Sequence, residues 1–76
     1  MLAIAKKDIT IDSFNAKSPK GNKLRKDRKI KQGEKLEVKN IFTSNGLATY
    51  GEECVIVIDE KGNQLSTYKD RFDYIK

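Results

Sequence analysis

The feature that most constrains this fold is an unbroken apolar run, residues 54–58, followed by a polar segment over 59–63. Most residues of the run are β-branched and the run is too short for a helix, so it predicts a strand. Because every side chain in it is apolar, both faces of the strand need cover, which predicts a central strand. Asp59 can hydrogen-bond to the backbone ahead of it and Gly62 tolerates a positive φ. Ile58 and Gln64 are therefore expected to flank a hairpin with a type I turn and a glycine bulge.

Alternating residues over 7–12 predict a half-buried strand with Ile9 and Ile11 inward. Phe14 falls out of phase with this alternation, so we expect the strand to bend near Ser13. Residues 15–29 contain Ser-Pro and Gly-Asn pairs and few apolar side chains, and they are expected to form a mobile basic loop.

The rest of the chain predicts further short strands joined by tight turns. We expect strands near residue 29 and over 35–42, and the pair Asn45-Gly46 then predicts a hairpin that returns over 47–50. A strand over 65–68, one helical turn at 69–71 and a closing strand over 72–75 complete the series. These elements predict a single all-β domain over 1–76, a small barrel of five to six strands with a long basic loop near its N-terminus.

Several of these segments carry a resemblance. The runs 30–38 and 56–62, with Tyr68 and the sequence Arg-Phe-Asp-Tyr-Ile at 71–75, resemble small bacterial and phage-encoded Src-homology-3-like barrels. The resemblance covers about residues 29–75 and concerns turn and core positions, so it implies a fold and an origin in a phage or mobile element. It does not imply a function. The chain has no Trp and no evident acidic, aromatic-lined groove, which disfavours recognition of proline-rich peptides.

Positive charge is concentrated in the first half of the chain. Residues 1–39 hold twelve Lys and Arg against five Asp and Glu, and residues 40–76 hold four against six. Within 17–35, nine cations face only Asp27 and Glu34. Such a block attracts polyanions. The candidate residues for binding nucleic acid or a partner are Lys17, Lys20, Lys23, Arg25, Lys26, Arg28, Lys29, Lys31 and Lys35, with Tyr50 and Tyr68 as candidate stacking residues.

Catalysis is not expected. The chain has no His and one Cys, so it lacks the usual base for a nucleophile and the ligands for a zinc site. Cys54 is expected to be a buried structural residue. We therefore expect no enzyme activity, no metal and no cofactor. Residues 1–5 are too short for a signal peptide, and the expected location is the cytoplasm of a bacterial host.

Three kinds of non-enzymatic function remain open. The basic segment 17–35 would engage nucleic acid or a nucleoprotein electrostatically. Alternatively, the chain is a small adaptor or inhibitor of phage type that grips a host protein, such as a defence or nucleic-acid-processing enzyme, through an acidic or nucleic-acid-binding surface. A structural or virion-associated role, with self-association through an edge strand, is the third.

Overall fold

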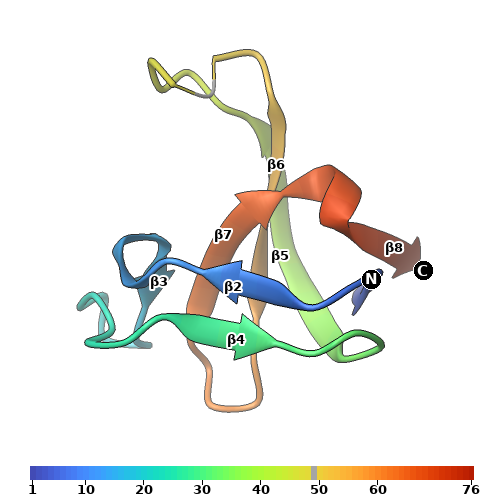
Figure 1. Ribbon diagram of the computed structural model, residues 1–76, viewed down its shortest axis with the longest axis horizontal. Helices are drawn as coiled ribbons and strands as arrows, with labels where there is room; N and C mark the ends of the chain where they lie inside the picture. Colours follow the sequence, from blue (N-terminus) through green and yellow to red (C-terminus); the bar gives the residue numbers. More distant parts are fainter. Residues whose placement is uncertain (49) are drawn as a thin grey trace.

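The computed structural model describes residues 1–48 and 50–76, and it is built almost entirely from short antiparallel strands (Figure 1). One sheet contains, in spatial order, β3 (Ala16–Lys17), β7 (Gln64–Tyr68), β6 (Glu53–Ile58), β5 (Lys35–Thr43), β1 (Leu2–Ala5) and β8 (Phe72–Ile75). The second sheet pairs β2 (Ile9–Ile11) with β4 (Arg28–Ile30). Two 3-10 turns, η1 (Ser13–Asn15) and η2 (Lys69–Arg71), complete the elements. The prediction of an all-β chain is confirmed, with eight strands in the described residues in place of the expected five or six.

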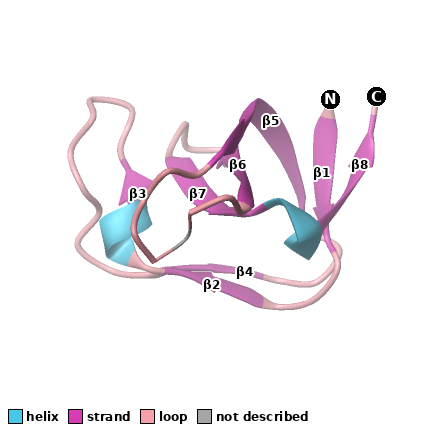
Figure 2. Ribbon diagram, turned by 90° about the horizontal axis from the view of Figure 1, so that it is seen from above, coloured by secondary structure: helices cyan, strands magenta, loops and turns pink. Residues whose placement is uncertain are grey.

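The two sheets enclose one hydrophobic core. Figure 2 shows the β2–β4 ribbon lying across the open side of the larger sheet. Ile9, Ile11 and Ile30 project inward from this ribbon and are almost completely buried. They pack in the same cluster as Phe72 from β8 and Leu65 from β7. The six-stranded order ends at β3 and β8, and in the described part of the chain no strand pairing joins those two ends.

The predicted central strand is confirmed, and its two faces differ. β6 lies between β5 and β7, and Val55 and Val57 are fully buried in the core. Ile56 and Ile58 face away from the core and are only half-buried. The run of apolar residues therefore reflects one fully covered face and one partly covered face.

The predicted turn after β6 is also confirmed. Ile58 pairs with Gln64, and the Gly62 N–H donates to the Asp59 carbonyl over 3.0 Å. Gly62 has a φ of 83°, a conformation that costs glycine no steric strain. Pro19 from the distant turn at 18–22 lies against this glycine, so the two turns are packed together.

The predicted return strand over 47–50 is wrong for Leu47, Ala48 and Tyr50, which lie in turns, and Thr49 is outside the described residues. The hairpin closes instead at Ser44 and Glu52, whose backbone N–H and carbonyl are 2.8 Å apart. Asn45-Gly46 thus lies inside a longer loop, because the backbone pairing of β5 with β6 ends before it.

Two strands were not predicted. β1 inserts between β5 and β8, and the small side chains of Ala3 and Ala5 allow these strands to approach the core closely. Part of the expected loop at 15–29 is paired as well. Ala16–Lys17 adds to the edge of β7, and a bridge between Lys17 and Lys23 closes a small hairpin.

The contact between the two turns predicts a difference between two glycine substitutions. A Cβ on Gly62 would lie 3.1 Å from Pro19 Cγ, whereas a Cβ on Gly33, which has a similar φ of 84°, would meet nothing within 4 Å. Both Gly33→Ala and Gly62→Ala should lower the free energy of unfolding by about 1 kcal/mol through backbone strain. Gly62→Ala should lower the free energy of unfolding by more than Gly33→Ala does, because Pro19 must also move.

Urea unfolding of the two variants measures this difference. In a Pro19→Ala background the two losses should become equal. Equal losses with Pro19 present would show that the two turns do not restrain each other.

Candidate anion-binding surface

The candidate cations separate into two groups in the structure. Arg28 is half-buried, and the other eight are exposed. The exposed ones are Lys17, Lys20, Lys23, Arg25, Lys26, Lys29, Lys31 and Lys35. They lie on the continuous stretch from β3 through β4 to the first residue of β5. Figure 1 shows that this stretch runs across the lower side of the molecule.

The eight exposed cations have no carboxylate partner among the described residues. The ion pairs found there are those of Lys6, Lys69 and Arg28. Unpaired ammonium and guanidinium groups keep their full positive potential and remain available to an external anion. Eight of the nine sequence-predicted cations are thus exposed along one stretch of the chain, with Arg28 as the exception.

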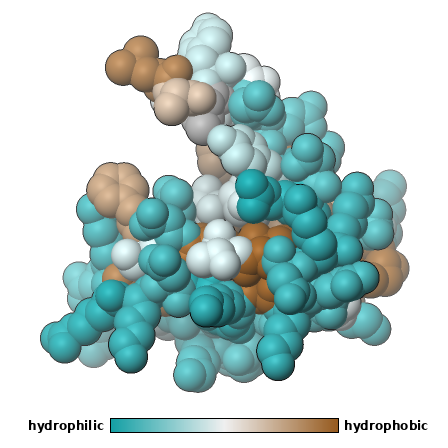
Figure 3. Space-filling model, in the orientation of Figure 1, coloured by the Kyte–Doolittle hydropathy of each residue, from teal (hydrophilic) through white to brown (hydrophobic). Residues whose placement is uncertain are grey.

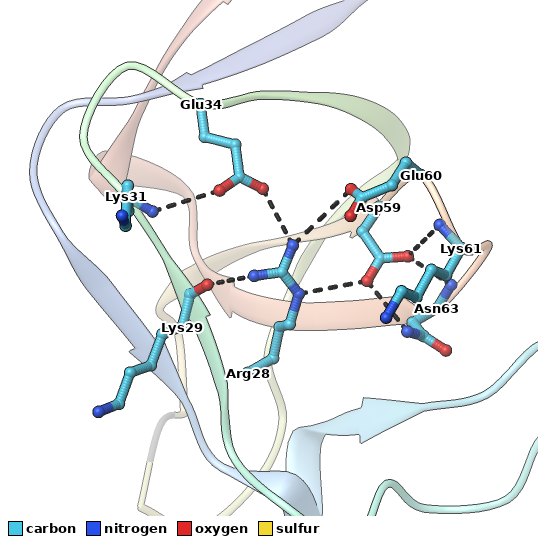
Figure 4. A network of polar contacts seen from close by, with 8 residues as sticks. All are labelled: Arg28, Lys29, Lys31, Glu34, Asp59, Glu60, Lys61 and Asn63. Carbon is cyan, nitrogen blue, oxygen red and sulfur yellow. Dashed lines mark hydrogen bonds and ion pairs between the residues drawn. The ribbon is translucent and has the colours of Figure 1, made fainter.

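Arg28 is held by three carboxylates (Figure 4). Its Nε donates to Asp59 Oδ2 over 3.3 Å, and its Nη2 lies 3.1 Å from Glu34 Oε2 and 3.8 Å from Glu60 Oε2. Nη1 donates to the carbonyl of Lys29. These contacts join β4 to the β6–β7 turn and to the turn before β5. Arg28 therefore stabilises the fold beneath the basic surface.

Asp59 is the buried centre of this network, and its side chain is fully shielded from solvent. Oδ1 accepts from the backbone N–H groups of Lys61 and Asn63, both over 2.9 Å, and Oδ2 accepts from Asn63 Nδ2 over 3.0 Å. Burial alone would raise the pKa of this carboxyl, but the hydrogen bonds from Asn63, Lys61 and Arg28 outweigh it and lower the pKa.

The two candidate stacking tyrosines have different surroundings. Tyr50 is 79% exposed, in the β5–β6 loop. Tyr68 is half-buried, and the Arg71 guanidinium lies 5.3 Å from its ring centroid. Figure 3 shows hydrophobic atoms at the projecting tip of the β5–β6 loop, above the largely hydrophilic body. Leu47, which is fully exposed, belongs to this tip.

Phe14 was not among the predicted site residues, although its side chain is 66% exposed next to the basic stretch. The Lys23 Nζ lies 3.7 Å from the centroid of its ring. The sequence signal that could have identified it is that Phe14 falls out of phase with the alternation over residues 7–12. A large apolar residue that follows a strand out of register cannot share the strand's buried face.

Among the described residues, no group of three or more His, Cys, Asp or Glu side chains is arranged to hold a metal ion. Burial, with a smaller contribution from Glu52, raises the pKa of the Cys54 thiol and disfavours the reactive thiolate. Burial also raises the pKa of Tyr74 to about 12, helped by Asp70, and the Tyr74 hydroxyl donates to the Lys69 carbonyl over 2.7 Å. No helix in the described residues has the length and apolar character to cross a bilayer.

The chain matches no protein-family model, and no curated protein or solved structure is significantly similar to it.

The Asp59 network predicts a large loss of stability when its charge is removed. Asp59→Asn should lower the free energy of unfolding at pH 7 by about 3 kcal/mol, because Arg28 loses its buried partner. Glu60→Gln is the matched control. Its carboxylate is the most distant of the three and largely exposed, so a change of about 0.5 kcal/mol or less is expected. Urea unfolding of both variants at pH 7 tests this, and equal losses would contradict the assigned role.

The same carboxylate predicts a pH dependence. A carboxyl with a pKa below its usual 3.8 in the folded state stabilises the protein above that value, and the contribution is lost as the pH falls through the folded-state pKa. The wild-type protein should therefore lose stability below about pH 4. Asp59→Asn should lose less over the same range. Parallel pH dependence of the two proteins would show that another group causes the acid sensitivity.

Proposed function

We propose that this protein is a non-enzymatic binding module that engages nucleic acid or a nucleoprotein through the basic stretch 17–35. The observation that carries the proposal is the set of eight exposed cations without carboxylate partners among the described residues. Lysine and arginine neutralise phosphates and release the counterions condensed on them, which favours binding without base specificity.

The shape of the molecule is compatible with this ligand. The chain measures 28 × 28 × 19 Å, and the basic stretch runs across its lower side (Figure 1). At about 3.4 Å per nucleotide, a surface of that length covers roughly eight nucleotides. An oligonucleotide of about twelve nucleotides is therefore a suitable probe.

We also propose that the fold is a Src-homology-3-like barrel and that the chain originates in a phage or mobile element. β5, β6 and β7 form a meander, a 3-10 turn follows, and β8 returns to pair with β1. We propose the barrel on this order of pairings. The fold alone does not select a ligand, because barrels of this size serve many functions.

Salt dependence and charge reversal test the proposed function together. Fluorescence polarisation with labelled oligonucleotides at about 50 and about 200 mM salt should show roughly a hundredfold weaker binding at the higher salt if about four phosphates are contacted. Arg25→Glu/Lys26→Glu should weaken binding at low salt at least tenfold and lower the slope of log K against log salt by about two.

The matched control is Lys39→Glu/Lys76→Glu, which changes the net charge equally at exposed residues outside the stretch. It should leave the slope unchanged. Equal effects of the two double variants would mean that net charge alone drives binding. The absence of binding at about 50 mM salt would refute the proposed function.

A second candidate function is favoured by the tip of the β5–β6 loop. Leu47 and Tyr50 are highly exposed there, and large apolar side chains at a projecting tip are typical of protein contacts. The chain would then act as an adaptor or inhibitor that grips a host protein, with the basic stretch facing an acidic or nucleic-acid-binding surface of that protein.

This candidate predicts that the tip and the basic stretch can be separated by mutation. Leu47→Ser/Tyr50→Ser should lose a protein that the wild type retains from a bacterial lysate, while its affinity for oligonucleotides stays within about twofold. Quantitative mass spectrometry of the proteins that the wild type and the variant retain from the lysate measures this loss. Identical sets of captured proteins would contradict the second candidate.

A further inference from the structure

A hollow of about 440 Å³ lies beside η1 on the outer face of the larger sheet. Ile56 from β6 and Gln64 and Ser66 from β7 contribute to its lining. These three residues alternate with the core residues Val57 and Leu65, so their side chains project from the opposite face of the strands. The volume lies within the roughly 300–1,000 Å³ usual for small-ligand sites.

The aromatic residue at this hollow is Phe14, and its backbone is fixed on both sides. The Phe14 N–H donates to Asp12 Oδ1 over 2.8 Å, and the Ser13 N–H donates to Asp27 Oδ1 over 2.9 Å. The Asn15 N–H donates to the Asp12 carbonyl over 2.8 Å. A ring that is 66% exposed on a fixed backbone can stack on a ligand with little further loss of entropy.

The remaining lining residues define the charge of a suitable ligand. Lys17 and Lys23 line the hollow, their backbones form a β-bridge, and no carboxylate is among the lining residues. The Lys23 ammonium lies 3.7 Å from the centroid of the Phe14 ring, so a cation and an aromatic ring adjoin at the hollow. Gln64 and Ser66 add neutral hydrogen-bonding groups. A ligand with a flat aromatic ring, polar edges and an attached anion matches all of these groups.

We propose that this hollow binds an unpaired nucleotide of a single-stranded nucleic acid. The base stacks on Phe14, its edge meets Gln64 and Ser66, and the neighbouring phosphates contact Lys17 and Lys23. This inference rests on the proposed function and narrows it, because bases in a duplex are stacked on their neighbours and have no free face for Phe14. The remaining cations of the basic stretch then contact phosphates further along the nucleic acid.

The chain contains no Trp, which allows a direct test of stacking. Phe14→Trp places a single tryptophan at the hollow, and Ile75→Trp places one at an exposed apolar position on β8, outside the basic stretch. Each variant is titrated with a twelve-nucleotide oligo-dT, a twelve-nucleotide oligo-U and a twelve-base-pair duplex at about 50 mM salt. Fluorescence of the Phe14→Trp variant should be quenched by the single strands and not by the duplex, and fluorescence of the Ile75→Trp variant should respond to neither.

Affinities provide the second measurement. Phe14→Ala should weaken single-strand binding about tenfold and leave duplex binding unchanged, since stacking on one aromatic side chain is worth about that factor or more. Phe14→Leu keeps an apolar side chain without a ring, so its affinity for single strands should fall as much as that of Phe14→Ala. Phe14→Tyr should bind like the wild type. Ile75→Ala, at an exposed apolar residue of β8 outside the basic stretch, is the control and should have no effect. Far-ultraviolet circular dichroism and thermal unfolding check that each variant is folded. If Phe14→Ala is not folded, the affinity of Phe14→Leu tests the stacking site.

The outcomes separate this inference from the proposed function. Salt-sensitive binding that is lost in Arg25→Glu/Lys26→Glu but unaffected by Phe14→Leu would overturn the stacking site and keep the proposed function. Quenching of Phe14→Trp by duplex as strongly as by single strands would overturn the preference for unpaired nucleotides. If the wild type binds none of the three probes, both proposals fail, and the protein-binding candidate is favoured.

Discussion

The structure depends on a buried carboxylate, that of Asp59, and on the guanidinium that compensates it. A shielded carboxylate is stable only when its oxygens are hydrogen-bonded, and here the backbone of the β6–β7 turn, Asn63 and Arg28 supply those bonds. Arg28, which lies in β4, also donates to Glu34 in the turn before β5. The β2–β4 ribbon covers the core and is thereby tied to the larger sheet. This compensation uses one cation of the basic stretch, and the other eight have no carboxylate partner in the part of the chain that the structure describes.

The exposed groups of the molecule fall into two regions of different chemistry. One is the basic stretch with Phe14 beside it, where charge and an aromatic ring adjoin. The other is the tip of the β5–β6 loop, where apolar side chains project away from the body (Figure 3). Electrostatic attraction acts over a distance of about 8 Å at physiological salt, whereas apolar contacts require close fit. The basic stretch is thus suited to capture a polyanion from solution, and the loop tip is suited to close contact with a protein.

Most of the strands could be predicted from sequence, because their signals are local. The alternation around Ile9 and Ile11, the apolar run of β6 and the Asp59–Gly62 turn chemistry act within a few residues. β1 was missed because four apolar residues at the start of a chain show no alternation of their own, and its partners lie more than thirty residues away. The structural role of Arg28 was hidden for the same reason, since its partner Asp59 is 31 residues away.

The hairpin at Asn45-Gly46 was misplaced because a turn signal marks where a chain can reverse, and the strand pairing decides where it does. The loss of phase at Phe14 was detected, but its proximity to Lys17 and Lys23 depends on the fold.

The position of β1 also determines when this protein can fold. Leu2 pairs with Ile75 and Ala5 with Phe72, so the first and last strands of the described chain are neighbours in the sheet. Such contacts close a long loop, and they slow folding because the entropy of closure is lost before the contact is gained. During synthesis, β1 has β5 on one side only until β8 has left the ribosome. The sheet is completed only once β8 has emerged, and until then one backbone edge of β1 is open to other chains.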